Sequence, residues 1–153
     1  MITALNAAEY LAMKHKSLFQ TDISEMKLHK LLYFAQRESI IETDSPLFAE
    51  NFEGWRFGPV IPSIRGHYKD ILNTVCILED MNSKTILDNT FHRYGEKNAW
   101  SLSRLSHGEE SWKRSRNGIS EDQNSDRIIL VDDIKIDAKR AKERRKILSE
   151  IGR

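Results

Sequence analysis

The segment from Ser24 to Ile41 constrains the fold most, because it carries the period of a helix. Four apolar residues share one face at positions i, i+3, i+4 and i+7: Leu28, Leu31, Leu32 and Ala35. Ser24 can cap the amino end of this helix, and the Glu25 carboxylate would lie in its first turn, where the helix dipole favours a negative charge. The pattern predicts an amphipathic helix over about residues 24–41.

The rest of the chain predicts a mainly α, single-domain bundle of about six helices with at most a minor β element. We expect helices over about 3–16, from Pro62 through Ile71, from Asn82-Ser83 to Gly95, and over about 133–150. Ser106 and Glu109 have capping-box spacing and predict a short helix that carries Trp112. Extended pieces are expected at 52–56 and 128–131, and a polar loop at 115–127.

Composition indicates one soluble globular domain over residues 1–153. Hydrophobic residues make up 39% and charged residues 31%, and the net charge is +1, so the whole molecule is not strongly attractive to nucleic acid. The one cysteine, Cys76, lies in an apolar run and is expected to be a small core residue. We expect a cytoplasmic protein with no signal peptide and no membrane span.

No motif in the chain points to catalysis. The five histidines show no i, i+4 pair, there is no second cysteine, and no phosphate-binding glycine loop occurs. Ser106 and His107 are adjacent, so their side chains would diverge on a helix, and the paired acids at 109–110 and 132–133 face apart for the same reason. We therefore expect no enzyme activity, no metal and no cofactor.

Three segments together are similar to a known family. The run from Lys27 to Phe34 (KLHKLLYF), the run from Trp55 to Val60 (WRFGPV), and the run from Leu105 to Trp112 (LSHGEESW) resemble the SocA-like Panacea antitoxin domain, also described as GepA-like phage-associated protein. The resemblance extends from about Leu5 to about Ile134. His29 stands where the family often has Gln, and Gly54 where a small residue such as Ala is usual.

The resemblance implies an antitoxin that neutralises a cognate toxin protein by direct binding. It also implies that the gene belongs to a phage or another mobile element. An alternative is a proteolytic adaptor that delivers the toxin to a cytoplasmic protease. A third reading is a nucleic-acid-binding regulator, although nucleic acid is not the partner that the composition favours. The sequence does not indicate the oligomeric state of this protein or the chemistry of its toxin.

Residue types suggest where a partner would bind. Lys30, Phe34 and Arg37 recur along one side of the 24–41 helix and form either a solvated face or a docking stripe. Arg56, in the loop between two aromatic residues, and Trp112 are further candidates, because arginine and aromatic residues dominate interface hot spots. These five residues are our expected partner contacts.

The last helix carries six cationic residues between Lys139 and Lys146. Lys139, Arg140, Arg144 and Arg145 are candidate nucleic-acid contacts, since such a patch can meet phosphates. Interleaved acids and the lack of aromatic residues for base stacking favour a solvated or partner-facing surface instead. This basic helix, about 133–150, lies outside the recognised motifs.

Overall fold

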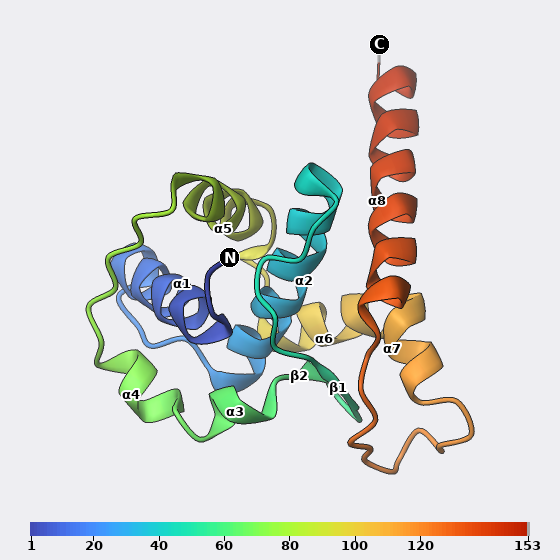
Figure 1. Ribbon diagram of the computed structural model, residues 1–153, viewed down its shortest axis with the longest axis horizontal. Helices are drawn as coiled ribbons and strands as arrows, with labels where there is room; N and C mark the ends of the chain where they lie inside the picture. The colour runs from blue at the N-terminus through green and yellow to red at the C-terminus, as the bar shows by residue number, and fades with distance from the viewer. Residues whose placement is uncertain (153) are drawn as a thin grey trace.

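The computed structural model describes residues 1–152 and confirms a mostly helical fold. Within that range it contains eight helices and one two-stranded sheet (Figure 1). The helices are α1 (Ala4–Phe19), α2 (Glu25–Thr43), α3 (Pro62–Arg65), α4 (Tyr68–Leu72), α5 (Met81–Tyr94), α6 (Ala99–His107), α7 (Glu110–Ser115) and α8 (Val131–Ile151). The strands are β1 (Glu53–Trp55) and β2 (Gly58–Val60).

Helix α2 is the centre of the molecule. It packs against α1, α5, α6, α8 and β2, and all its residues from Lys27 to Ile40 are buried. The Ser24 hydroxyl accepts a hydrogen bond from the Lys27 amide at 3.2 Å, which confirms the predicted cap. The apolar face was visible in the sequence, but burial on all sides was not, because the other side of α2 is covered by elements distant in the chain.

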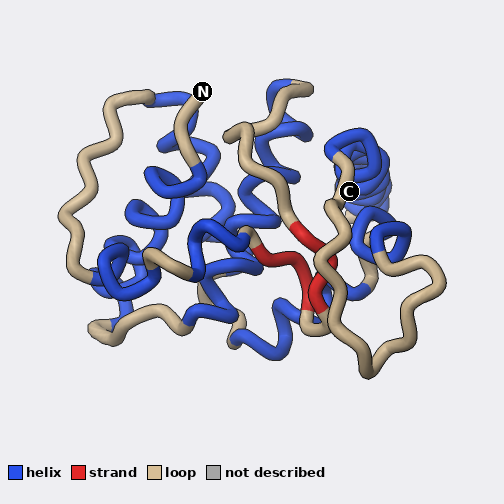
Figure 2. The backbone as a smooth tube through the Cα atoms, turned by 60° about the horizontal axis from the view of Figure 1, so that its bottom comes forward, coloured by secondary structure: helices blue, strands red, loops and turns tan. Residues whose placement is uncertain are grey.

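The extended piece expected near residues 52–56 forms β1, which pairs antiparallel with β2 (Figure 2). Gly58 directly follows the two-residue turn and has φ of 117°, a conformation that strongly favours glycine. The expected strand at 128–131 is wrong. Only Ile128 forms a bridge, to Glu53, because β1 offers a very short edge, and α8 already begins at Val131.

The helix expected from Pro62 to Ile71 is split into α3 and α4 around Gly66-His67, and the N-cap of α5 is Asp80 rather than Asn82 or Ser83. The split and α6, which we did not expect, raise the number of helices from the expected six to eight in the described range 1–152.

The capping box expected at Ser106 and Glu109 is also wrong. Ser106 lies inside the last turn of α6, and its hydroxyl donates to the Ser103 carbonyl at 2.7 Å. Helix α7 is instead capped from α8. The Asp137 carboxylate accepts hydrogen bonds from the amides of Glu110 at 2.8 Å and Ser111 at 2.9 Å. A cap supplied from a distant helix leaves no local sequence signal.

Helix α8 stands beside α2 and α7, and its carboxyl end extends past the rest of the molecule (Figure 1). Its first half contributes Ile134, Ala138 and Ala141 to the interior, whereas every residue from Lys146 to Gly152 is exposed. Cys76 is buried as expected, and burial raises the pKa of its thiol. Among residues 1–152, no helix combines the length and apolar character that a bilayer crossing demands.

Candidate functional site

The three sequence motifs meet at the β1–β2 hairpin. Lys30 of α2 reaches the Pro59 carbonyl at 3.3 Å, and Ser103 of α6 donates to the Phe57 carbonyl at 2.6 Å. The Trp112 indole of α7 donates to the Trp55 carbonyl at 2.8 Å. Side chains from three helices therefore fix the hairpin backbone, which makes its exposed side a preorganised surface.

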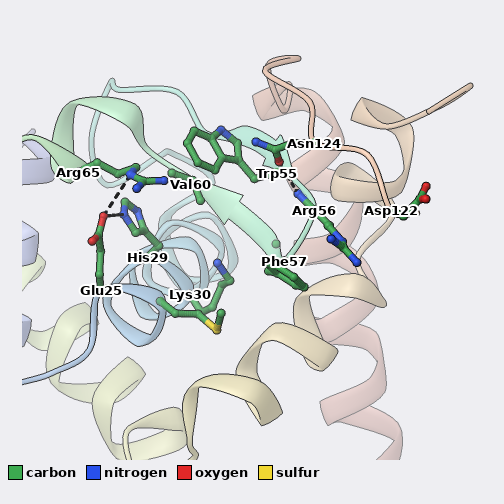
Figure 3. Close-up of a pocket in the computed structure, with 12 residues that line it drawn as sticks. Glu25, His29, Lys30, Trp55, Arg56, Phe57, Val60, Arg65, Asp122 and Asn124 are labelled. Atoms are coloured by element: carbon green, nitrogen blue, oxygen red, sulfur yellow. Dashed lines mark hydrogen bonds and ion pairs between the residues drawn. The ribbon is translucent and has the colours of Figure 1, made fainter. Parts of the chain in front are cut away.

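A pocket of about 450 Å³ opens between α2 and the hairpin (Figure 3). Helix α2 supplies one side through Glu25, Met26, His29 and Lys30. The hairpin supplies another from Trp55 to Val60, and the remaining border comes from Arg65 and from Asp122 and Asn124 of the loop before α8. Residues more than sixty positions apart in the chain thus surround one cavity.

Lys30 is the most unusual group in this pocket. Its side chain is 2% exposed, and burial lowers the pKa of the amine to about 7. Its one hydrogen bond, to Pro59, uses a single donor of the three that an ammonium group carries. A Cβ on Gly58 would stand 2.6 Å from Lys30 Cε, so the glycine makes room for this lysine.

His29 adds a second buried polar group. Its Nδ1 accepts a hydrogen bond from the Ile61 amide at 3.3 Å, which places the proton of the neutral ring on Nε2. Burial, reinforced by Lys30 and Arg65, lowers the pKa of His29 to about 3. The ring is therefore neutral near pH 7, and its 3.7 Å approach to Glu25 is neither an ion pair nor a hydrogen bond. Nε2–H has no hydrogen-bond partner among residues 1–152.

The rim of the pocket combines aromatic rings and arginines. The Arg65 guanidinium lies 4.8 Å from the Trp55 ring centroid, and Arg56 lies 4.9 Å from that of Phe57. The Arg56 amide donates to Asn124 at 2.8 Å, so the pre-α8 loop steadies the tip of the hairpin (Figure 3). Arg65 pairs with Glu25 at 3.3 Å, whereas Arg56 has no ion-pair partner within residues 1–152. The free cation at Arg56 and the spare donors of Lys30 favour a partner group that carries an acceptor or a negative charge.

The other side of the hairpin tip borders a second cavity, which Trp112 and His107 also line. Their rings stack at 4.2 Å with an interplanar angle of 13°. Arg116 lies 5.3 Å from the Trp112 ring and donates to the Gly54 carbonyl at 2.9 Å. Ser115 fills the volume that a Cβ on Gly54 would need, which explains why glycine suits this position.

The expected partner contacts divide into two groups. Arg56 is exposed and Trp112 is half-buried, so both stand at the surface around the hairpin. Lys30, Phe34 and Arg37 are 2%, 1% and 4% exposed, so the expected surface stripe on α2 does not form. Their contacts with a partner stay a prediction. Lys30 lines the pocket at the hairpin, while Phe34 and Arg37 line a separate cleft beside α8.

Sequence reasoning missed a buried polar cluster under α8. Arg37 pairs with Glu109 and donates to the Tyr94 hydroxyl at 2.6 Å. The Tyr33 hydroxyl lies 3.2 Å from Glu109 and 3.3 Å from Asp137. Burial raises the pKa of Glu109 to about 7, against the opposing charge of Arg37. No spacing in the sequence links these residues, because they come from α2, α5, α8 and the residue that precedes α7.

The four candidate nucleic-acid contacts on α8 differ in their surroundings. Arg145 pairs with Glu38 through both terminal nitrogens, and Arg140 lies 3.6 Å from Glu110. Lys139 and Arg144 form no ion pair with any residue in the range 1–152. Arg145 therefore holds α8 to α2, whereas the other three cations face outward.

Across residues 1–152, no three His, Cys, Asp or Glu side chains are grouped as a metal site would require. The hairpin region offers a shaped cavity, hydrogen-bond donors and a rim of arginine and aromatic side chains. These features are typical of binding sites.

Residues 28–113 match a family model described as "Antitoxin SocA-like, Panacea domain". Antitoxin SocA of Caulobacter vibrioides (strain NA1000 / CB15N) is 45% identical over 42 residues, which make up 28% of this chain and 22% of that protein. The match thus spans about a fifth of the length of this relative. No solved structure matches the chain. The matched range contains the hairpin and its supporting helices but excludes α1 and α8.

Proposed function

The chain belongs to the antitoxin SocA-like Panacea domain family, and we propose that it is the antitoxin of a toxin–antitoxin pair. It neutralises its cognate toxin by direct, stoichiometric protein–protein binding. The observation that carries this proposal is the meeting of the three motif segments at one hairpin, where they build a binding surface.

The hairpin surface has the properties of a docking site. Its backbone is fixed from beneath, so little conformational entropy is lost when a partner binds. Trp55, Arg56, Phe57 and Arg65 offer the residue types that contribute most at interface centres. A toxin side chain with an acceptor or a negative charge at its end suits the pocket, because the exposed Arg56 and the spare donors of Lys30 line it.

Co-expression with the neighbouring reading frame tests the function. We expect the product of a small adjacent gene to stop growth when produced alone, and this chain to restore growth and to co-purify with that product. If growth is not restored, the antitoxin proposal fails.

A charge reversal locates the interface. Arg56→Glu should weaken binding of the toxin by about tenfold or more, because it removes an exposed cation and repels an anionic partner group. Lys69→Glu, an exposed reversal on α4 that makes the same change in net charge, is the matched control and should bind normally. Isothermal titration calorimetry measures both. If both variants bind the toxin with equal affinity, the toxin does not contact the hairpin at Arg56.

Toxin stability separates this mechanism from delivery to a protease. Under direct inhibition the toxin accumulates as a complex, so its half-life in the cell is unchanged or longer when the chain is present. A half-life that shortens only when both the chain and a cytoplasmic protease are present would identify an adaptor instead.

A further inference from the structure

The cleft beside α8, with a volume of about 600 Å³, lies between α8 and the adjacent ends of α5 and α6. Its interior reaches the buried Phe34 and Tyr94, and α8 forms one whole side of it. The carboxyl end of α8 extends past the rest of the molecule (Figure 1). Helix α8 also lies outside the residues that match the family model, so the cleft is bordered both by the matched domain and by an element beyond the match.

The cleft is strongly cationic at its edge. Arg93 and Lys97 come from the end of α5 and the turn after it, Arg104 from α6, and Arg140 and Arg144 from α8. All five are exposed. Within residues 1–152 only Arg140 has an ion-pair partner, Glu110 at 3.6 Å. The carboxylates that line the cleft, Glu109 and Asp137, are buried and already bonded to Arg37 and to the amides of α7. The accessible charge is therefore positive.

The same cleft has an exposed apolar side. Leu105 of α6 is 43% exposed and Leu148 of α8 is 63% exposed, and both line the cavity. Ile147 and Ile151 continue the exposed apolar surface along the outer part of α8. A soluble helix end that combines exposed leucine and isoleucine with unpaired arginine is typical of a surface that another protein covers.

We propose that this cleft binds an acidic amphipathic segment of the toxin, with carboxylates opposite Arg93, Arg104 and Arg144 and apolar side chains against Leu105 and Leu148. This inference rests on the proposed function, because it takes the toxin as the partner. The cleft and the hairpin surface would then provide two separate contacts, the first of which depends on an element outside the family match.

The features of the cleft favour a protein segment over nucleic acid. Phe34 and Tyr94 are buried, so the cleft offers no exposed aromatic ring for base stacking. A phosphate backbone has no apolar groups that could bury Leu105 and Leu148. The net charge of +1 also gives no strong long-range attraction for nucleic acid. An acidic segment with leucine-like side chains satisfies both the charges and the apolar surface.

A model peptide tests the chemistry of the site with the full chain. The probe is a fluorescein-labelled, acetylated and amidated peptide with glutamate on one helical face and leucine on the other. Fluorescence anisotropy should show saturable binding that weakens as salt is added. A peptide with the same charge and serine in place of leucine should bind several-fold more weakly, as should the Leu148→Ser variant with the original peptide.

Two double variants on α8 provide the matched comparison. Arg140→Gln/Arg144→Gln removes two cations from the cleft, while Lys139→Gln/Lys142→Gln removes two exposed cations of the same helix that do not line it. We expect about tenfold weaker peptide binding for the arginine pair and a change within about twofold for the lysine pair. Circular dichroism checks that both remain folded.

Equal losses for the two double variants, absence of saturable peptide binding, or tighter binding of a labelled DNA duplex than of the peptide would each overturn the inference. The same variants in the co-expression assay separate it from the proposed function. Failure of the unmodified chain to neutralise the toxin refutes the proposed function. Full neutralisation and unchanged toxin affinity with the arginine variant refute the role of the cleft alone.

Discussion

Single residues set the electrostatics of the hairpin pocket, and Lys30 dominates them. Its amine is buried beneath Gly58 and Pro59 with one hydrogen bond, and burial lowers its pKa to about 7. An amine so close to its titration point near neutral pH can meet a partner group either as a cation or as a neutral donor. The position therefore affects both the stability of the protein and the chemistry of binding.

Stability should depend on pH through Lys30. Between about pH 7 and pH 10.5 the unfolded chain holds a proton on this amine that the folded protein has released, so the free energy of unfolding rises with pH in this window. Relative to Lys30→Met, the wild type should gain on the order of 3 kcal/mol from pH 7 to pH 10. Urea unfolding at each pH measures the difference, and a constant difference would contradict the assignment.

Gly58 should tolerate no side chain. Gly58→Ala would impose a φ of 117° on alanine and place its Cβ 2.6 Å from both Lys30 Cε and Ser106 Oγ. We expect a loss of about 2–4 kcal/mol in the free energy of unfolding. Gly118→Ala is the matched control. Its φ is 82° but nothing lies within 4 Å, so only the backbone term of about 1 kcal/mol remains. Similar losses in thermal or urea unfolding would show that the close packing around Gly58 is unimportant.

At the scale of elements, α8 is joined to the body by its residues up to Arg145. Asp137 caps α7, Arg145 pairs with Glu38, and Ala138 and Ala141 are buried. Beyond Arg145 the residues up to Gly152 are exposed and contribute no interior contact. Residues up to Arg145 therefore attach this helix to the body, and the exposed residues beyond it are free for the partner contact that we propose.

A truncation should separate these tasks. Removal of residues 146–153 should change the free energy of unfolding by less than about 1 kcal/mol, because it exposes no core surface. Asp137→Ala should cost about 2–3 kcal/mol, since it leaves the amides of Glu110 and Ser111, at the amino end of α7, without their acceptor. Chemical unfolding of both proteins checks the contrast, and a severe loss from the truncation would refute it.

At the scale of the whole molecule, α2 connects nearly every part. It packs on α1 and α5 at one side and on α6, α8 and β2 at the other (Figure 1). No segment between Ala4 and Ala141 forms an apolar core that excludes α2. Disruption of this helix would expose the interior of the entire protein.

We therefore expect one cooperative unfolding transition. Tryptophan fluorescence, which reports on Trp55, Trp100 and Trp112 near the hairpin and α6–α7, should change at the same urea concentration as circular dichroism, which reports on all helices. Coincident midpoints and slopes would establish a single domain. A separate, earlier fluorescence transition would show that the hairpin region unfolds independently of α1 and α5.

The local sequence correctly predicted α1, α2 with its Ser24 cap, and the long final helix. It could do so because helical periodicity and capping depend on residues only a few positions apart. The local sequence also predicted the extended segment that forms β1, and its motifs identified the family. Local signals misled at Ser106, where the favourable spacing to Glu109 was overridden by Asn98, which caps α6 earlier in the chain.

The sequence by itself determined a mainly helical antitoxin-family domain, since helical period and motif order are properties of neighbouring residues. Only the tertiary structure decided that Lys30, Phe34 and Arg37 lie inside, because their burial is imposed by the hairpin, α5 and α8 from elsewhere in the chain. It also decided that Arg145 binds Glu38 while Arg144 on the same helix stays at the edge of a cleft. Long-range packing sets the environment of each charge, and no run of sequence letters carries that information.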